Sequence, residues 1–227
     1  MHNFLIIPAF KPNKRLISLI KLLNKIGNLK ILVVNNGNDI KYNSFFEDLS
    51  QYKNTETTLV RNNLGKGYGI KMGLQFIKNK DGNINACIFA DADGQHTFDD
   101  IVKILDYCNN NDITKKIIIG ARQHNIYSPI LNRVGNYFYN FFFNSKYQSR
   151  VNDCLSGLRA VSFRDIELLI NIKENDFRFE VSTLKEYIKK KYNIIEIKVS
   201  STYFKDKKSH FLKFKDSIKL LKYIFSK

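Results

Sequence analysis

The stretch Ala86-Cys87-Ile88-Phe89-Ala90-Asp91-Ala92-Asp93-Gly94-Gln95-His96-Thr97 joins an apolar run to an acidic, polar segment. Five consecutive apolar residues predict a strand that is buried on both faces, as in a parallel sheet. In an extended backbone, Asp91 and Asp93 would point to the same side because side chains alternate along a strand. The sequence therefore predicts a pair of carboxylates at the end of a central strand.

Two interpretations of this acidic pair are open. Hard divalent cations such as Mg²⁺ and Mn²⁺ prefer oxygen ligands, and Gln95 adds an amide oxygen to those of Asp91 and Asp93. Alternatively, Asp-Ala-Asp-Gly is an ordinary turn, and Thr97 with Asp100 forms the capping box of the following helix. The position after a buried strand, with an amide side chain close by, favours the metal site.

Apolar runs and amphipathic segments alternate along the chain. This order is typical of βαβ units, with a mostly parallel sheet and helices on both faces. Ligands of such sheets bind at the carboxyl ends of the strands, where loops containing Pro8-Ala9, Asn35-Asn36, Asn62-Asn63 and Asp91-Ala92-Asp93 are expected to meet. Strands are expected at 4–7, 31–34, 57–61, 86–90, 116–121 and 193–200, and helices at 14–26, 44–52, 67–78, 98–110, 131–145, 180–190 and 214–226.

Composition limits the class of protein. The 227 residues, 44% of them hydrophobic, suit one globular domain. A formal charge of +16 implies an anionic partner, either nucleotide phosphates, an anionic membrane surface or nucleic acid. Three cysteines without a Cys-x-x-Cys spacing favour a reducing compartment. Neither a signal peptide nor a run of about 20 apolar residues is present, so we expect a cytoplasmic protein, soluble or peripheral on the membrane.

Three segments carry a family resemblance. They are Ile6-Ile7-Pro8-Ala9-Phe10, Asn63-Leu64-Gly65-Lys66-Gly67-Tyr68-Gly69-Ile70-Lys71-Met72-Gly73 and Ala90-Asp91-Ala92-Asp93-Gly94-Gln95-His96. In this order they resemble the first strand, the Gly-Lys-Gly helix and the Asp-x-Asp segment of family 2 glycosyltransferases, particularly the polyprenyl-phosphate sugar synthases. The chain departs from the family at Asn35-Asn36, where Asp-Asp is usual. The resemblance implies a GT-A type α/β fold, a nucleoside-diphosphate sugar donor, and Mg²⁺ or Mn²⁺ at Asp91, Asp93 and Gln95.

The resemblance also implies which residues bind the donor. An asparagine at position 36 can hydrogen-bond the edge of a nucleobase, and glycines at a helix start let backbone amides approach a phosphate. The family often closes a basic, serine-containing loop over the diphosphate, which makes Lys207 to His210 the candidates here. The expected donor-binding residues are Pro8, Ala9, Asn36, Asn63, Gly65, Lys66, Asp91, Ala92, Asp93, Lys208, Ser209 and His210.

Residues 1–121 are expected to bind the nucleotide and 122–227 the acceptor. Gly120-Ala121-Arg122 resembles the family's Gly-Ser-Arg, and Arg122 and Arg133 can hold a phosphate by charge-assisted bonds or form surface ion pairs.

Asp153 precedes Ser156-Gly157-Leu158-Arg159, similar to the family's Ser-Gly-Phe-Arg, and its open roles are metal ligand, base or turn cap. A base needs a raised pKa. Glu180 is expected to bind sugar hydroxyls or to start a helix. The expected catalytic residues are Asp93, Arg122, Arg133 and Asp153.

Two segments suggest contact with a membrane. The helix at 131–145 is aromatic nearly all round, which predicts either full burial, the preferred interpretation, or partial insertion into lipid or a partner. The final helix alternates lysines with apolar residues, a pattern that suits anionic lipid as well as ordinary packing.

The sequence therefore predicts a metal-dependent glycosyltransferase that moves a sugar from a nucleoside diphosphate to a polyprenyl phosphate or a glycan or lipid-linked acceptor in cell-surface polysaccharide synthesis. Three alternatives are weaker. A nucleotidyltransferase would need a long glycine-rich loop after the first strand, and a nucleic-acid binder would need a recognised motif, since the positive charge is spread along the chain. A non-catalytic homologue is suggested only by Asn35-Asn36. These residues do not reveal the sugar, the base, the stereochemistry or the oligomeric state.

Overall fold

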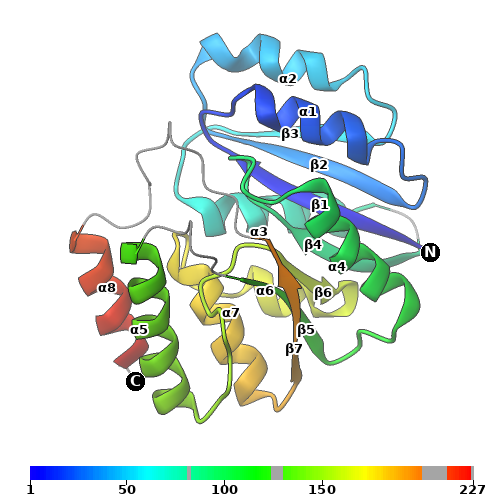
Figure 1. The fold of residues 1–227 in the computed structure, drawn as a ribbon. Helices are drawn as coiled ribbons and strands as arrows, with labels where there is room; N and C mark the ends of the chain where they lie inside the picture. Colours follow the sequence, from blue (N-terminus) through cyan, green and yellow to red (C-terminus); the bar gives the residue numbers. More distant parts are fainter. Residues whose placement is uncertain (81–82, 124–129, 201–213, 226–227) are drawn as a thin grey trace.

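The computed structural model describes residues 1–80, 83–123, 130–200 and 214–225. Within these ranges a seven-stranded sheet has the order β3-β2-β1-β4-β6-β5-β7, and helices cover both of its faces (Figure 1). The candidate lid residues Lys207, Lys208, Ser209 and His210 lie outside the described residues. The strands are β1 (His2–Ala9), β2 (Leu29–Asn36), β3 (Thr55–Val60), β4 (Ile84–Phe89), β5 (Lys116–Arg122), β6 (Arg159–Ser162) and β7 (Asn193–Val199).

The predicted helices are present with small differences at their ends, and the short helix Ile166–Ile170 was not predicted. Asn13 caps the first helix through a bond from Arg15 N to its side chain, and a glycine with φ of 112° precedes the third. The helices are α1 (Lys14–Leu23), α2 (Asn43–Leu49), α3 (Lys66–Lys78), α4 (Phe98–Asn110), α5 (Ile130–Tyr147), α6 (Ile166–Ile170), α7 (Arg178–Lys189) and α8 (Phe214–Phe225), with 3₁₀ turns η1 (Ile40–Tyr42) and η2 (Phe163–Asp165).

Side-chain alternation divides the core into two layers. In β1, Leu5 and Ile7 pack with α1, α2 and α4, whereas Phe4 and Ile6 pack on the opposite face with α3, α6 and α7. Nearly every side chain of β1 and β2 is buried, as a central parallel strand requires. The predicted α/β architecture is therefore confirmed.

The short strand β6 is the main difference from the predicted topology. It runs antiparallel between β4 and β5, and Ala160 pairs with both Ile88 and Ile118. The remaining pairings are parallel. Because β1, β2, β3 and β4 are neighbours and run in one direction, their carboxyl ends form a single edge, where the four predicted loops meet.

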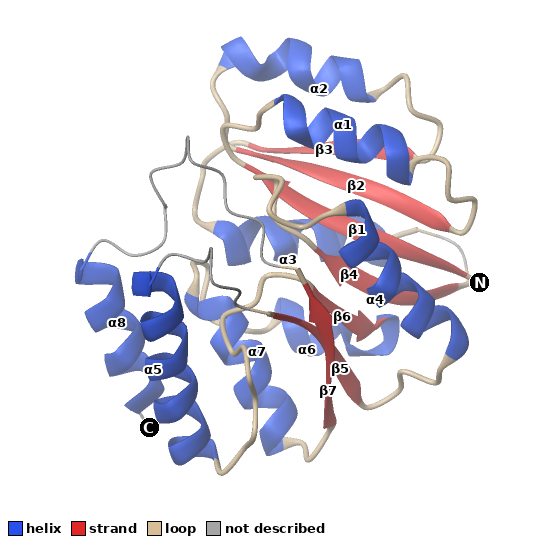
Figure 2. Cartoon of the chain, in the orientation of Figure 1, coloured by secondary structure: helices blue, strands red, loops and turns tan. Residues whose placement is uncertain are grey.

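The aromatic helix α5 corrects one expectation. Tyr139 and Phe143 are buried, but Tyr137, Phe138 and Phe141 are exposed, so the expected full burial is wrong. This helix lies beside α8 at one side of the molecule (Figures 1 and 2). Among the described helices, none has the length and apolar character needed to cross a bilayer.

Candidate functional site

The loops after β1, β2 and β3 meet at the start of α3. Asn36 Nδ2 donates to the carbonyl of Gly65 at 3.0 Å, and Gly65 N donates to Asn63 Oδ1 at 2.9 Å. A Cβ added to Gly69 would lie 2.9 Å from Pro8 Cβ, so the absence of a side chain lets α3 approach β1. Four expected donor-binding residues, Pro8, Asn36, Asn63 and Gly65, are thus brought together.

The two asparagines after β2 differ in their bonding. Asn35 Oδ1 accepts bonds from the backbone and side-chain amides of Asn38, at 3.2 and 2.8 Å, so Asn35 holds its own turn. Asn36 is buried, and its Oδ1 has no hydrogen-bond partner in the described part of the chain. A buried acceptor is normally satisfied, so Asn36 Oδ1 is available to a donor group of a ligand.

Lys66 joins the Asp-x-Asp turn to α7. Its Nζ lies 2.5 Å from Asp91 Oδ1 and 2.7 Å from Glu180 Oε1. Burial alone would lower the pKa of Lys66, but the two carboxylates outweigh it and raise that pKa. Burial would likewise raise the pKa of Asp91, yet Lys66 and the His96 ring, 3.2 Å from Asp91 Oδ2, lower it. The lysine expected to bind phosphate therefore keeps a carboxylate ionised.

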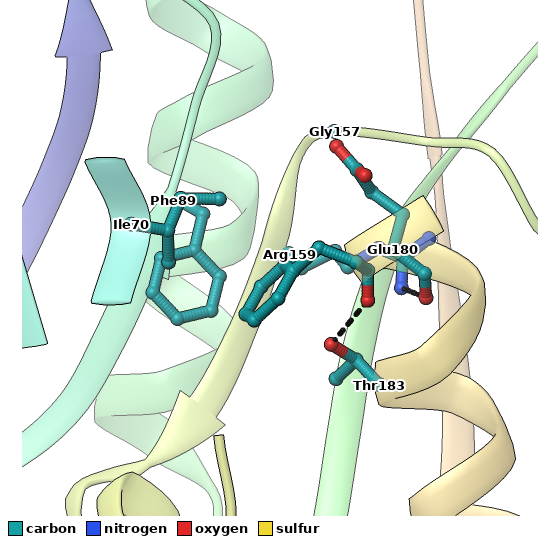
Figure 3. A pocket seen from close by; sticks show the side chains of 7 residues that line it. Ile70, Phe89, Gly157, Arg159, Glu180 and Thr183 are labelled. Carbon is teal, nitrogen blue, oxygen red and sulfur yellow. Dashed lines mark hydrogen bonds between the residues drawn. The ribbon is translucent and has the colours of Figure 1, made fainter. Parts of the chain in front are cut away.

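A glycine makes this arrangement possible. A Cβ added to Gly157 would lie 2.5 Å from both Asp91 Oδ2 and Lys66 Nζ. A pocket beneath the glycine is lined by Ile70, Phe89, Gly157, Arg159, Phe179, Glu180 and Thr183 (Figure 3). Glu180 Oε2 is buried there without a hydrogen-bond partner among the described residues. The pocket therefore holds a second buried acceptor without a partner in the described chain, in addition to Asn36 Oδ1.

The Asp-x-Asp segment is a turn and not an extension of β4. Ala92 and Asp93 lie in the turn, Gln95 N donates to Asp93 Oδ1 at 3.0 Å, and the Thr97–Asp100 capping box is present. The turn and cap interpretation is thus correct in geometry, and the argument from an extended backbone is wrong. The turn geometry does not exclude ligand binding, because Asp91, Asp93 and Gln95 all keep part of their surface exposed.

The donor set of this turn fits a hard cation. Two carboxylates and one amide supply oxygen ligands, and such cations take their remaining ligands from water and substrate phosphates. The described residues contain no cluster of three or more His, Cys, Asp or Glu side chains arranged to hold a metal. A cation here would therefore depend on the phosphates of its ligand.

Asp153 is bound on both oxygens. Arg122 Nε donates to Oδ2 at 2.7 Å and Arg122 Nη2 to Oδ1 at 2.8 Å, with a third bond from Arg122 N. Burial would raise the pKa of Asp153, but the guanidinium outweighs it and holds the pKa below its usual range. A base near neutrality needs the opposite shift, so the geometry does not support Asp153 as a base. Arg133 is exposed in the first turn of α5.

Arg159 and Glu196 are site residues that received no role from the sequence. Arg159 is buried and donates to the carbonyls of Ser156, Cys154 and Glu180, at 2.7, 2.8 and 2.5 Å. Glu196 on β7 accepts from Asn152 N at 2.8 Å and supports the loop that carries Asp153. The arginine in Ser-Gly-Leu-Arg was a usable signal, whereas nothing near Glu196 in the sequence distinguishes it.

Comparisons with known proteins agree with this geometry. The sequence profile of glycosyl transferase family 2 matches residues 4–169. A UDP-N-acetylglucosamine–dolichyl-phosphate N-acetylglucosaminyltransferase of Methanococcus voltae is 27% identical over 221 residues, 88% of this chain and 85% of that protein. A protein of uncharacterised function from Methanocaldococcus jannaschii is 28% identical over 198 residues, 84% of this chain and 76% of its own.

The similar solved structures share the fold at low identity. Glucosyl-3-phosphoglycerate synthase from Mycobacterium tuberculosis, in complex with Mn²⁺, UDP and glucosyl-3-phosphoglycerate, superimposes with a TM-score of 0.69 at 13% identity. The match covers 98% of this chain and 77% of that one. A complex of the same enzyme with Mn²⁺, UDP and phosphoglyceric acid gives a TM-score of 0.67 at 12% identity.

Proposed function

Because this chain belongs to glycosyl transferase family 2 and is a glycosyltransferase with a GT-A type fold, we propose that it transfers a sugar from a nucleoside diphosphate to a lipid-linked phosphate. The observation that carries this proposal is the group of polar side chains at the carboxyl edge of the sheet. There the Asp91 turn faces the start of α3, and two buried acceptors, Asn36 Oδ1 and Glu180 Oε2, lack partners in the described chain.

Residues 1–121 supply most of the donor site in this proposal. Asn36 Oδ1 accepts a bond from the nucleobase, and Glu180 Oε2 accepts one from a sugar hydroxyl. Asp91, Asp93 and Gln95 would hold Mg²⁺ or Mn²⁺, which would stabilise the negative charge of the departing diphosphate. Lys66 keeps Asp91 ionised, and His96 contacts the same carboxylate, so the turn has a fixed charge before the donor arrives.

The Arg122–Asp153 pair supports a phosphate acceptor over a hydroxyl acceptor. Asp153 orients the guanidinium, and about a quarter of the Arg122 side chain, 26%, stays exposed. An oriented guanidinium binds phosphate oxygens in pairs. A phosphate needs no base: its oxygen forms the new bond to the anomeric carbon, and the diphosphate leaves with the electrons of the broken bond. Asp153 is thus a positioning residue here, and Arg133 a second phosphate contact.

The relatives support the same chemistry. One is named for a dolichyl-phosphate acceptor, and a structure of the same fold holds UDP with Mn²⁺. A role in cell-surface polysaccharide synthesis, at the inner face of the cytoplasmic membrane, follows from such an acceptor and forms part of the proposal.

A donor and acceptor panel tests this function. We expect a UDP-sugar to raise the melting temperature in the presence of Mn²⁺ more than GDP- or CDP-sugars do, since a ligand of the folded state alone stabilises it. Radiolabelled sugar should then appear on a short polyprenyl phosphate and not on the matching polyprenol. Equal transfer to both lipids would refute the phosphate acceptor. Absence of any donor effect and of any product would refute the function.

A further inference from the structure

The exposed face of α5 has the pattern of a face that is normally buried. Val134, Tyr137, Phe138 and Phe141 recur at positions i, i+3, i+4 and i+7, the spacing of a single apolar stripe. Their exposed fractions are 60%, 75%, 44% and 58%. Tyr139 and Phe143, which fill the core, lie on the other side of the helix. The exposed stripe is therefore not part of the hydrophobic core.

Two asparagines beside the exposed stripe fasten α5 to the loop that carries Asp153. Asn140 donates to the carbonyl of Asn152 and accepts from Cys154 N at 2.9 Å. Asn144 accepts from Val151 N and donates to the Val151 carbonyl, both at 2.9 Å. These bonds fix the rotation of the helix, so its aromatic stripe cannot turn inward without breaking them.

Helix α8 extends the apolar surface. Phe225, 51% exposed, stacks edge-on against Phe142 with ring centroids 5.3 Å apart, and Phe142 in turn contacts Phe138 at 4.5 Å. Tyr147 Oη donates to the carbonyl of Ile224. The two helices lie side by side (Figure 2). We call the surface formed by Val134, Tyr137, Phe138, Phe141 and Phe225 the aromatic face.

The two helices that form the aromatic face carry positive charge. The sequence of α5 contains Arg133 and Lys146 and no acidic residue, and that of α8 contains three lysines and one aspartate. Arg133, Lys146, Lys219 and Lys222 are exposed. Two copies of a chain with a net charge of +16 would repel each other across this face. Anionic lipid headgroups attract lysine and arginine, and aromatic side chains suit the headgroup boundary.

We propose that the aromatic face docks on an anionic phospholipid bilayer, with Tyr137, Phe138 and Phe141 inserted at the headgroup boundary. This deepens the proposed function, on which it rests for the lipid nature of the acceptor. The same helix then links bilayer and site: its aromatic stripe meets lipid, and the asparagines beside the stripe hold the loop of Asp153, which orients Arg122.

A tryptophan scan tests the docking directly. The chain contains no Trp, so Tyr137→Trp places a single indole on the aromatic face, and Ile40→Trp, at a site 84% exposed on η1, serves as the matched control. Each variant is mixed with vesicles of phosphatidylcholine alone or with phosphatidylglycerol added. We expect both variants to sediment with the anionic vesicles, but only Tyr137→Trp emission to shift to the blue. Added salt should weaken the binding.

A second variant measures the aromatic contribution. Phe138→Ser with Phe141→Ser removes two exposed rings, and we expect vesicle affinity to fall by about tenfold for each ring. Circular dichroism confirms that the variant is folded. No blue shift at position 137 with anionic vesicles would overturn the proposal, as would an equal shift with phosphatidylcholine alone. A shift that grows with protein concentration without vesicles, together with a dimer in sedimentation velocity, would assign the face to a second copy.

The vesicle experiment does not depend on catalysis. Donor binding is followed by the melting temperature and transfer by a detergent-dispersed polyprenyl phosphate, both without a bilayer. Vesicle docking without sugar transfer would support the membrane-docking surface and refute the proposed function. Sugar transfer without vesicle docking would support the proposed function and refute the membrane-docking surface.

Discussion

Asp91 and Asp153 lie at the same edge of the sheet, and each is paired with a basic side chain, but their surroundings differ. Asp153 is fully buried and both of its oxygens are bound by Arg122, whose guanidinium and backbone amide supply three hydrogen bonds. Asp91 keeps 28% of its side chain exposed and lies beside Asp93 and Gln95 in a turn. Asp153 is enclosed and serves to hold its partner. Lys66 and His96 contact the two oxygens of Asp91, but its exposed surface remains accessible to a ligand.

The largest effect on stability should come from removing the buried carboxylate of Asp153. Asp153→Ala leaves Arg122 without its partner, and breaking a buried ion pair costs about 3–5 kcal/mol in the free energy of unfolding. Urea denaturation of the variant measures this loss. Asp48→Ala, at an exposed position of α2, is the control and should stay within about 0.5 kcal/mol of the wild type. A loss as small as the control's would mean that Asp153 does not hold Arg122.

In the acidic turn of Asp91 and Asp93, a substitution should reduce activity strongly and stability little. Asp93→Asn keeps the shape of the side chain but removes a charge that faces the proposed cation, so we expect kcat to fall by about 100- to 1000-fold. Unfolding free energy should change by less than about 1 kcal/mol. Asp99→Asn, exposed in the first turn of α4, is the control for charge near the site. Unchanged turnover in Asp93→Asn would show that the acidic turn has no catalytic role.

A substitution beside Asp91 sharpens the difference. Gly157→Ala places a methyl group 2.5 Å from Asp91 Oδ2 and Lys66 Nζ, so one of them must move. Because both atoms end flexible side chains, the cost in unfolding free energy should be about 1 kcal/mol, at the low end for overpacking, while donor affinity should fall because the Lys66–Asp91 pair is displaced. Gly27→Ala, where nothing lies within 4 Å of the added Cβ, should be neutral. Donor affinity equal to that of the wild type, measured by calorimetry, would show that the tight contact is not needed.

The smallest effect is the pH dependence of stability. The pKa of Asp153 is lower in the folded than in the unfolded chain, so its contribution is present above an unfolded pKa of about 3.9 and is lost as pH falls through the folded pKa. One such group changes stability by at most about 1.4 kcal/mol per pH unit. Below pH 4, Asp153→Asn should therefore lose stability less steeply than the wild type. Parallel curves for the two proteins would contradict the lowered pKa.

Much of the fold was predictable because it depends on local patterns. Alternation of apolar strands and amphipathic helices identified the order of the elements, and helix α4 agreed with the prediction at both ends. Strand β6 was missed because its four residues, Arg159–Ser162, are too few for a periodic signal. The aromatic stripe of α5 was misjudged because periodicity identifies an apolar face but not what covers it.

The sequence predicted which residues belong to the site better than it predicted their hydrogen-bond and ion-pair partners. Sequence placed Asn36, Gly65 and Asp91 at one edge, and the structure brings them together. The partners of Lys66 were not predictable, because Asp91 and Glu180 are distant in sequence and the fold joins them. The same is true of Arg122 and Asp153, which lie 31 positions apart.

Anomalous diffraction from a crystal soaked with Mn²⁺ and a nucleoside diphosphate tests the central claim most directly. The account predicts a manganese peak bonded to Asp93 and the diphosphate, with Asp91 and Gln95 facing it. A peak located elsewhere, or no peak while the diphosphate is bound, would contradict the proposal that this acidic turn holds the cation that assists departure of the diphosphate.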